Sequence, residues 1–393
     1  MTGHRILLAH PSADLYGSDR VLLESIDALL ADQARVTVTM PVPGPLVAEI
    51  EKRGATVVIC PSPVLRKDIV TPRGLARFLA ATVRGVLSGR RLIRTERPSA
   101  IYVNTITVPL WLPLARLSGI PSLCHVHEAE GSAGRLVRVA LATPLLFATR
   151  IIANSEYSVD VLNSAIPRVG ARTQVIYNAV PGPDTASEAR AELTDGIRLV
   201  YVGRLSPRKG VDVAVSALSV LHARGIPASL DVVGSVFPGY EWYEHDLRAQ
   251  AARVGSVRFH GYQDPVWDHL AEADVAVVPS RYDEPFGNTA VEAMLARRPV
   301  IVSATSGLRE ATSRYQSAQR VLPSSPDAIA DAVEQVASNW AEIRAMASED
   351  RDLARDRHSA GRYAAAITGV VHEMIANEDE RMFRGKKLST SIG

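Results

Sequence analysis

The stretch Arg281-Tyr-Asp-Glu-Pro-Phe-Gly-Asn-Thr-Ala-Val-Glu-Ala-Met294 follows a short β-branched run, Ala273 to Pro279, which is typical of a buried strand entering a loop. Asn288 and Thr289 are good helix-starting residues, so we expect a helix to begin near Asn288 with its free backbone amides pointing back across the loop. Free amides at the carboxyl end of a strand form an anion site.

Two carboxylates accompany this predicted anion site. Glu284 lies in the loop, and Glu292, four residues after Asn288, lies on the same face of the predicted helix. Acids beside a cluster of positive backbone dipoles are not needed for folding. They suit a ligand that carries both phosphate and several hydroxyls, such as a sugar nucleotide.

The glutamate pair closely resembles a family motif. Glu284 and Glu292 are separated by seven residues, with Pro-Phe-Gly after the first and Ala-Met after the second, as in the retaining glycosyltransferases of family four. These enzymes have the GT-B architecture, which consists of two facing Rossmann-like domains with parallel sheets and an interdomain cleft. The resemblance therefore implies an α/β fold of this kind.

Length and composition agree with two soluble domains. A chain of 393 residues exceeds the roughly 250 to 300 residues at which a single core stops growing. Hydrophobic residues make up 47% and charged residues 22%, and the net charge of +2 gives no global drive toward nucleic acid. Cys60 and Cys124 fall in or beside apolar runs and are predicted to be buried free thiols; no zinc-binding spacing occurs.

Neither the N-terminus nor the most apolar later stretch predicts a membrane span. Residues 1–10 enter a strand at once and lack the apolar region of a signal peptide. The most apolar later stretch, 139–148, is about half a membrane span and contains a proline. We therefore expect a cytoplasmic protein.

The N-terminal half alternates strand-like runs with helical patterns, which predicts a parallel sheet covered on both faces. Residues 18–31 carry the apolar spacing of a helix, and Gly17 lies in the turn before it. In the family a glycine-rich loop approaches the donor here, so the resemblance assigns Gly17 to donor binding. The predicted strands of this half are 6–9, 36–40, 56–60, 100–104, 122–126, 150–154 and 173–177.

The strand at 122–126 leads into two histidines and an acid. His125, His127 and Glu128 stand at its carboxyl end, where ligands of parallel sheets bind. The family carries a histidine there, usually followed by an acidic residue, and the resemblance implies that His127 contacts the donor sugar. His125, two residues earlier, shares its side of the strand and is the main competitor for the assignment.

The segment 73–97 predicts a basic amphipathic helix with a break near Gly89. Seven arginines alternate with apolar residues along it. Two interpretations are open: the helix lies on an anionic membrane surface, or its arginine face is solvated while the helix packs against the sheet.

The C-terminal half begins after a proline- and glycine-rich passage at 178–185 and restarts with a strand at 197–202. Gly203 and Arg204 follow this strand, and Lys209 follows five residues later. Gly-Arg and Lys-Gly at this spacing resemble the same family, in which both cations bind the nucleotide diphosphate; Arg208 is a less certain contributor.

The remaining pattern is doubly wound, with predicted strands at 229–233, 257–260, 275–278 and 299–302. The resemblance implies that the backbone around Tyr262 receives the nucleotide base. A final helix is predicted at 362–375, which in GT-B proteins crosses back to the first domain. The predicted division is 1–180 for the acceptor-side domain, 181–360 for the nucleotide-sugar domain, 361–377 for the crossing helix and 378–393 for a flexible tail.

The resemblance, which spans about residues 5 to 375, implies a retaining glycosyltransferase that moves a sugar from a nucleotide diphosphate donor to a hydroxyl of a glycan, glycolipid or small molecule. No cofactor or metal is implied, because fixed cations take the place of magnesium. A polysaccharide or glycolipid pathway at the inner face of the plasma membrane is expected. The implied catalytic residues are His127, Arg204, Lys209 and Glu284, and the implied donor-binding residues are Gly17, Gly203, Tyr262, Phe286, Gly287, Asn288, Thr289 and Glu292.

Three other functions fit the same motifs. A sugar-nucleotide epimerase and a glycan phosphorylase can use this architecture, and a non-catalytic sugar-nucleotide-binding protein could retain it. The identity of the sugar, the base, the acceptor, the linkage and the oligomeric state are not encoded in these motifs.

Overall fold

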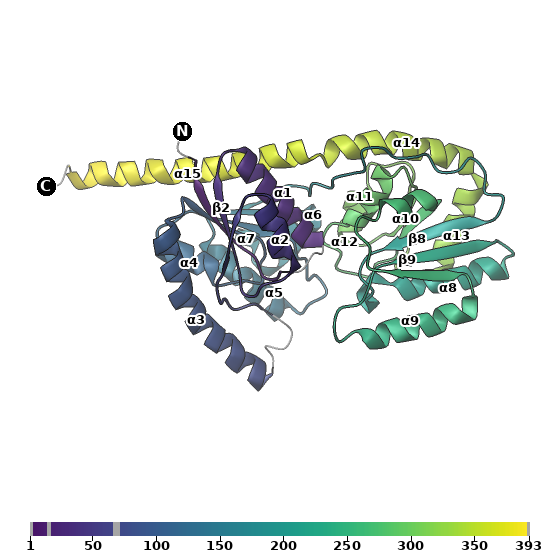
Figure 1. Cartoon of the computed structure of the whole chain (residues 1–393), viewed down its shortest axis with the longest axis horizontal. Helices are drawn as coiled ribbons and strands as arrows, with labels where there is room; N and C mark the ends of the chain where they lie inside the picture. Colours follow the sequence, from purple (N-terminus) through teal and green to yellow (C-terminus); the bar gives the residue numbers. More distant parts are fainter. Residues whose placement is uncertain (1–2, 14–16, 66–70, 391–393) are drawn as a thin grey trace. The chain divides into compact units, whose positions relative to one another are not determined.

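The computed structural model describes residues 3–13, 17–65 and 71–390 (Figure 1). The chain divides into two compact units. Unit 1 comprises Met1–Ala179 and Ala360–Gly393, and unit 2 comprises Val180–Ser359. The sequence placed these divisions at 180/181 and 360/361.

Unit 1 is built on a parallel sheet of seven strands in the order β3-β2-β1-β4-β5-β6-β7. Its strands are β1 (Arg5–Ala9), β2 (Arg35–Met40), β3 (Thr56–Ile59), β4 (Ala100–Val103), β5 (Ser122–Val126), β6 (Arg150–Ala153) and β7 (Thr173–Val175). Its helices are α1 (Gly17–Ala31), α2 (Pro45–Lys52), α3 (Pro72–Glu96), α4 (Trp111–Leu117), α5 (Arg135–Ala142), α6 (Glu156–Ala165), α7 (Pro167–Gly170) and α15 (Ala360–Thr390), with a 3-10 turn η2 (Thr143–Phe147).

Alternation along the strands of unit 1 separates two cores. Ile6 and Leu8 of β1 point to the layer formed with α1 and α15, whereas Leu7 and Ala9 point to the layer formed with α4. Both sets are fully buried, as expected for a parallel sheet covered on both faces. Figure 1 shows α15 running beside α1.

Unit 2 has a six-stranded parallel sheet in the order β10-β9-β8-β11-β12-β13. Its strands are β8 (Ile197–Val202), β9 (Ala228–Val233), β10 (Val257–Gly261), β11 (Val275–Val278), β12 (Val300–Ser303) and β13 (Ala318–Val321). Its helices are α8 (Val211–Ala223), α9 (Glu241–Val254), α10 (Trp267–Glu272), α11 (Asn288–Leu295), α12 (Ser306–Ala311), α13 (Pro326–Ser338) and α14 (Trp340–Arg357), with a 3-10 turn η3 (Pro207–Lys209).

The predicted fold class is confirmed: each unit is a doubly wound, Rossmann-like α/β unit. Three details differ from the sequence predictions. The edge strand β13 was not predicted, α3 passes through Gly89 without a break, and α15 continues to Thr390 through residues expected to form a tail. Cys60 and Cys124 are buried and free, as predicted.

The helices of the described residues include none that is both long enough and apolar enough to cross a membrane. Residues 139–148 form the end of α5, the turn η2 and Ala148.

Candidate functional site

A cluster of charged residues in unit 2 lies where the strand order reverses, at the carboxyl ends of the adjacent strands β8 and β11. The crevice at such a reversal is the usual ligand site of doubly wound sheets. The loop after β8 supplies Arg204 and Lys209, and the loop after β11 supplies Glu284. Residues 75 positions apart in the chain therefore meet at one edge of the sheet.

Lys209 and Glu284 form the central ion pair of this cluster. The Lys209 ammonium donates to Glu284 Oε2 at 2.6 Å, and the Ser280 hydroxyl donates to the same oxygen at 2.9 Å. Arg208 Nη1 lies 3.9 Å from that oxygen and also donates to the carbonyl of Asp283. One carboxylate is thus surrounded by two cations and a hydroxyl.

Burial and charge act against each other in this pair. Burial disfavours the ionised form of Glu284, but the charges of Lys209 and Arg208 and the hydrogen bonds outweigh it, so the pKa of Glu284 lies below its ordinary value. Burial lowers the pKa of Lys209, and the neighbouring Glu284 charge partly restores it. At neutral pH Glu284 is an ionised carboxylate in a water-poor site.

The two loops are also joined through their backbones. The Arg281 amide donates to the Arg208 carbonyl at 2.8 Å, and the Arg281 side chain donates to the Pro207 carbonyl at 2.8 Å. Gly210 has a φ of +68°, and a Cβ there would lie 2.2 Å from the carbonyl oxygen of Pro279. Only glycine permits this close approach, which fixes Lys209 against the Glu284 loop.

Helix α11 begins at Asn288, as predicted, after Gly287 in a left-handed conformation at φ +106°. Asn288, Thr289 and Glu292 are half-buried on its first turns. Phe286 is only 1% exposed and packs edge-to-face against His358 at 5.5 Å. Its side chain therefore belongs to the core, and this position can reach a ligand only through its backbone.

The remaining predicted donor residues of unit 2 line the same edge of the sheet. The Gly203 amide donates to the Val233 carbonyl at 2.9 Å, and the Gly234 amide donates to the Gly261 carbonyl at 2.7 Å. These hydrogen bonds connect the carboxyl ends of β8, β9 and β10. The Arg204 guanidinium carbon lies 3.7 Å from the ring centre of Phe237. Tyr262, by contrast, has an exposed side chain.

A second cluster lies in unit 1, at the carboxyl ends of β1, β4 and β5, again where the strand order reverses. His127 is buried, and its Nε2 lies 3.0 Å from Oδ1 of Asn104. Asn104 Nδ2 lies 3.3 Å from His10 Nδ1, and His10 Nε2 lies 2.7 Å from Asp19 Oδ1. The predicted His127 is therefore the end of a four-residue polar chain.

His10, Asp19 and Asn104 were not predicted from the sequence. The available signal was their position, because His10 directly follows β1 and Asn104 directly follows β4. Asp19 lies in the first turn of α1, two residues after Gly17. Gly17 itself opens α1 and is exposed, and the preceding Tyr16 lies outside the described residues.

His125 and His127 do share one side of the strand, with ring centres 3.9 Å apart. His125 is fully buried and faces inward, with Nδ1 at 2.7 Å from the Tyr102 hydroxyl. The Tyr102 hydroxyl lies 3.2 Å from the Ser25 hydroxyl, which in turn lies 2.6 Å from the Tyr363 hydroxyl of α15. His125 therefore belongs to an internal hydrogen-bond network, whereas His127 contacts Asn104.

Both histidines are neutral. Burial, with a further contribution from His10, lowers the pKa of His127 to about 3, and burial also places the pKa of His125 well below its ordinary value. The Glu128 carboxylate bonds to the backbone of His127 and not to its imidazole, whose Nε2 contacts Asn104. The same carboxylate accepts the backbone amides of Ile106 and His127, at 3.3 and 3.1 Å, and the Thr105 hydroxyl, which shapes the loop.

Within the described ranges, no group of three or more His, Cys, Asp or Glu side chains is arranged to hold a metal ion.

Comparison with known families gives two adjacent matches. The model described as "Glycosyl transferases group 1" matches residues 184–352, and the model described as "Glycosyltransferase Family 4" matches residues 16–181. These matches correspond closely to unit 2 and to the N-terminal part of unit 1.

Curated relatives match parts of the chain. An uncharacterised glycosyltransferase of Methanocaldococcus jannaschii is 37% identical over 144 residues, 36% of each chain. A glycogen synthase of Mycobacterium tuberculosis is 28% identical over 276 residues, 66% of this chain and 65% of that one. A D-inositol 3-phosphate glycosyltransferase of Geodermatophilus obscurus is 30% identical over 249 residues, 58% of this chain and 54% of that one. The matches thus span from 36% to 65% of the length of these relatives.

Solved structures match nearly the whole chain. HepE of Anabaena, solved with UDP and glucose, has a TM-score of 0.77 at 20% identity and covers 94% of this chain and 99% of its own. A sucrose-phosphate synthase of Thermosynechococcus elongatus has a TM-score of 0.76 at 20% identity and covers 95% of this chain and 100% of its own. At this identity the likeness concerns the fold.

Proposed function

The chain belongs to the group 1 glycosyltransferases of the GT-B fold, and from this premise we propose that it transfers a sugar from a nucleotide diphosphate sugar to a hydroxyl of a glycan, glycolipid or small-molecule acceptor. The proposed reaction retains the anomeric configuration and needs no metal ion. A ligand of the proposed donor class, UDP-glucose, is bound in another structure of HepE, to which this chain is similar with a TM-score of 0.77 at 20% identity.

The observation that carries the proposal is the cluster of Arg204, Lys209 and Glu284 at the reversal of the unit 2 sheet. Departure of a nucleotide diphosphate leaves negative charge on its terminal phosphate. Arg204 and Lys209, with the first amides of α11, offer fixed positive charge to that group. Charges held in place before the reaction stabilise the leaving group without reorganisation, which is the main source of electrostatic catalysis.

Glu284 and Glu292 are proposed to hold different parts of the donor. Glu284 accepts hydroxyls of the transferred sugar while its Oε2 remains engaged by Lys209. Glu292, one turn into α11, accepts the ribose hydroxyls. His127 is proposed to contact the sugar from unit 1 as a neutral imidazole, since its pKa of about 3 keeps it uncharged.

The acceptor is proposed to be membrane-associated, with α3 as the contact. This helix packs through Gly85 and Gly89, where an added Cβ would lie 2.7 and 2.8 Å from Leu110 and Leu114 side chains of the neighbouring segment. Leu92 and Ile93, near the end of α3, are buried in the core, whereas the other leucines of the helix are exposed. The exposed apolar residues are Leu75, Leu79, Val83 and Leu87, spaced by four residues along one face.

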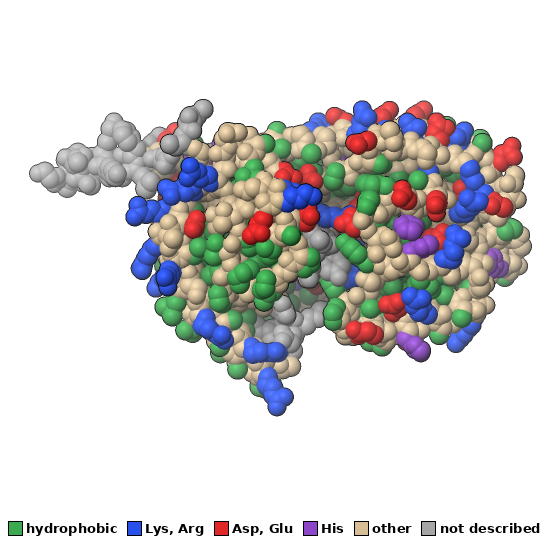
Figure 2. All heavy atoms as spheres, in the orientation of Figure 1, with side chains coloured by type: hydrophobic (Ala, Val, Ile, Leu, Met, Phe, Trp, Pro, Cys, Tyr) green, Lys and Arg blue, Asp and Glu red, His purple; other side chains and the backbone are tan. Residues whose placement is uncertain are grey.

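Arginines accompany this apolar face. All seven arginines of 73–97 are exposed, and Figure 2 shows blue and green side chains mixed along the region where Figure 1 draws α3. Apolar and cationic side chains on one exposed helix favour an anionic bilayer surface. We propose that the protein acts on a glycolipid or polysaccharide acceptor at the inner face of the plasma membrane.

The decisive experiment is incubation with UDP-, GDP- and ADP-sugars without acceptor. A transferase leaks donor slowly to water and releases free sugar with nucleotide diphosphate. An epimerase would instead return an isomeric donor, and a binding protein would return the donor unchanged. Release of sugar 1-phosphate from a glycan in the presence of phosphate would indicate a phosphorylase. Lys209→Gln is the matched variant, and it should lower the rate of the slow hydrolysis about 10- to 100-fold.

A further inference from the structure

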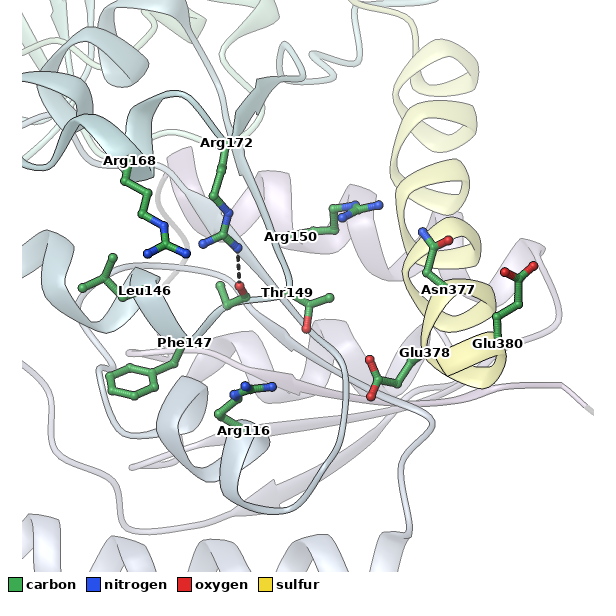
Figure 3. A pocket seen from close by; sticks show the side chains of 11 residues that line it. Arg116, Leu146, Phe147, Thr149, Arg150, Arg168, Arg172, Asn377, Glu378 and Glu380 are labelled. Carbon is green, nitrogen blue, oxygen red and sulfur yellow. Dashed lines mark hydrogen bonds between the residues drawn. The ribbon is translucent and has the colours of Figure 1, made fainter. Parts of the chain in front are cut away.

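Unit 1 contains an open pocket of about 650 Å³ that the proposed reaction does not use (Figure 3). It lies at the amino edge of the sheet. Arg150 is the first residue of β6, and Thr149 before it donates its amide to the Ser122 carbonyl, at the start of β5, at 2.9 Å. His10, Asn104 and His127 follow the opposite, carboxyl ends of β1, β4 and β5. A four-residue strand such as β6 spans about 13 Å, so the pocket is separate from those residues.

Four arginines line this pocket: Arg116, Arg150, Arg168 and Arg172. Arg172 donates to the Ala148 carbonyl at 2.7 Å, which holds its guanidinium at the pocket wall. Figure 3 shows the guanidinium groups of Arg168 and Arg172 directed toward the same side of the pocket. Among the described residues, the side chains of Arg116, Arg150 and Arg168 have no hydrogen bond or ion pair.

Four like charges around one hollow repel one another, and an anion that enters the hollow relieves this repulsion. Guanidinium groups bind phosphate oxygens through pairs of parallel hydrogen bonds, and several of them around one cavity suit a phosphate dianion. The protein supplies only part of the opposite charge, since Glu378 and Glu380 of α15 also line the pocket. Figure 3 shows the Glu380 carboxylate pointing away from the arginines.

The rest of the lining suits a hydroxyl-rich carrier of the phosphate. Asn377 from α15 offers an amide, and Thr149 from the sheet edge offers a hydroxyl that also accepts the Ser122 amide at 3.1 Å. The half-exposed ring of Phe147, 43% exposed, offers an apolar face of the kind that packs against the C–H side of a sugar.

We propose that this pocket is a second ligand site, distinct from the donor site, that binds a phosphate group carried on a polyhydroxylated molecule such as a sugar phosphate. The arginines hold the phosphate, and the groups from α15 and Thr149 hold the hydroxyls. The phosphate can arrive on a free sugar or on a lipid headgroup. The site does not depend on the proposed transferase activity, because its residues all belong to unit 1.

The test is calorimetric titration of the full chain with inorganic phosphate, glucose 6-phosphate and glucose. We expect saturable binding of glucose 6-phosphate, weaker binding of inorganic phosphate and none of glucose. Arg168→Gln should weaken glucose 6-phosphate binding at least about fivefold, and the double substitution Arg150→Gln with Arg168→Gln at least about tenfold, since each removes charge-assisted hydrogen bonds. Arg168 is exposed, so its substitution leaves the core intact.

Two control variants locate the binding. Arg73→Gln, an exposed arginine at the start of α3, should leave binding unchanged. Lys209→Gln should also leave it unchanged, while lowering affinity for UDP, whereas the pocket variants should bind UDP as the unmodified protein does. Loss of glucose 6-phosphate binding in Lys209→Gln but not in Arg168→Gln would assign the phosphate to unit 2 and overturn the proposal, as would absence of saturable binding below about 10 mM.

The source of the phosphate is decided with vesicles. Phosphatidylcholine vesicles with and without phosphatidylinositol 4-phosphate are compared for the unmodified protein and Arg168→Gln. Binding that requires both the phosphoinositide and Arg168 supports the site and identifies a lipid headgroup. Binding of glucose 6-phosphate without binding to the phosphoinositide vesicles supports the site and identifies a soluble ligand. If Arg168→Gln changes neither measurement, the arginines are a solvated surface.

Discussion

Glu284 and Glu292 differ in their surroundings in a way that predicts different mutant behaviour. Glu284 is 7% exposed and neutralises Lys209, whereas Glu292 lies half-buried on α11. Glu292→Gln should weaken binding of the nucleotide diphosphate about tenfold or more, because a charge-assisted hydrogen bond to ribose is worth roughly 1.5 to 3 kcal/mol. Glu284→Gln should cut turnover while nucleotide diphosphate affinity at pH 7 stays within about twofold, since the transferred sugar is the only part of the donor that Glu284 is proposed to contact.

Calorimetric titration of nucleotide diphosphate beside steady-state kinetics separates the two effects. Glu272→Gln is a suitable control, because Glu272 is exposed at the end of α10, at the opposite edge of the unit 2 sheet. Equal losses of nucleotide affinity in both glutamate variants would show that Glu284 does not face the sugar.

The neutral His127 predicts a pH dependence of stability. Its pKa is about 3 in the folded chain and near 6.5 when unfolded, so between these values the unfolded chain binds the extra proton. The stabilisation is therefore fully present above pH 6.5 and is lost as the pH falls toward 3. From pH 6.5 to 5.5, the loss attributable to His127 should be about 1 kcal/mol.

Urea unfolding at pH 7.5, 6.5 and 5.5 measures this slope for the unmodified protein, His127→Gln and His245→Gln. The slope below pH 6.5 should be shallower in His127→Gln and unchanged in His245→Gln, since His245 is exposed. His125, whose pKa is also depressed by burial, should preserve part of the slope in the first variant. Identical slopes in all three proteins would mean that folding does not lower the pKa of His127.

At the scale of single elements, the loop that carries Lys209 depends on one glycine. Gly210→Ala would place a Cβ 2.2 Å from the Pro279 carbonyl oxygen and push the Lys209 loop away from the Glu284 loop. Gly225→Ala is a matched control, because its φ of +74° is similar but nothing lies within 4 Å of the added Cβ. Both variants pay the left-handed strain of roughly 1 to 2 kcal/mol.

Only Gly210→Ala should also lose nucleotide diphosphate affinity, by at least about tenfold, and it should show the larger fall in melting temperature. Thermal unfolding and calorimetric titration of both variants provide the comparison. Retained affinity in Gly210→Ala would indicate that the two loops can separate without disturbing the diphosphate site.

Helix α3 carries the membrane proposal. Its exposed face includes Leu79, Val83 and Leu87, which are 55%, 64% and 66% exposed. Replacing all three by serine should reduce sedimentation with anionic vesicles at least about tenfold, because burying each apolar side chain in a bilayer is worth up to roughly 1.5 to 3 kcal/mol. The fold should be unaffected, since these side chains are outside the core.

Vesicle sedimentation at low and high salt, with neutral vesicles beside anionic ones, measures both contributions. Leu322→Ser, an isolated exposed leucine of unit 2, is the control. Equal retention on neutral and anionic vesicles would favour the alternative, in which the arginines of α3 are a solvated face.

At the scale of the whole molecule, the sequence predicted the two parallel sheets and most strands because their apolar runs are buried on both faces and are bounded by glycine and proline. The edge strand β13 was missed, since Ala318-Gln-Arg-Val321 contains two polar residues and carries only a weak strand signal. The extension of α15 was missed for a related reason: residues 378–390 are strongly polar, and composition alone favoured a tail.

The candidate site shows where such inference stops. The motif residues of the Lys209 and Glu284 loops could be found because their spacing is local and distinctive. The partners of His127 could not, because Asn104 and His10 lie 23 and 117 positions before it and meet it only through strand order. The pocket at the amino edge combines arginines from α4, β6 and α7 with residues of α15, which no local pattern relates.

The arrangement of fixed cations leads to a last prediction, on metal dependence. Arg204 and Lys209 reach one sheet edge from the loop after β8, and α11 adds backbone amides near the same edge, so protein groups can neutralise the departing diphosphate. Transfer should therefore persist in excess chelator. Arg204→Gln and Lys209→Gln should each lower kcat by about 10- to 100-fold, because each removes charge-assisted hydrogen bonds worth roughly 1.5 to 3 kcal/mol in the transition state. Added magnesium or manganese should not restore either variant. Loss of activity of the unmodified protein in chelator, recovered with manganese, would contradict this and assign the charge neutralisation to a bound ion.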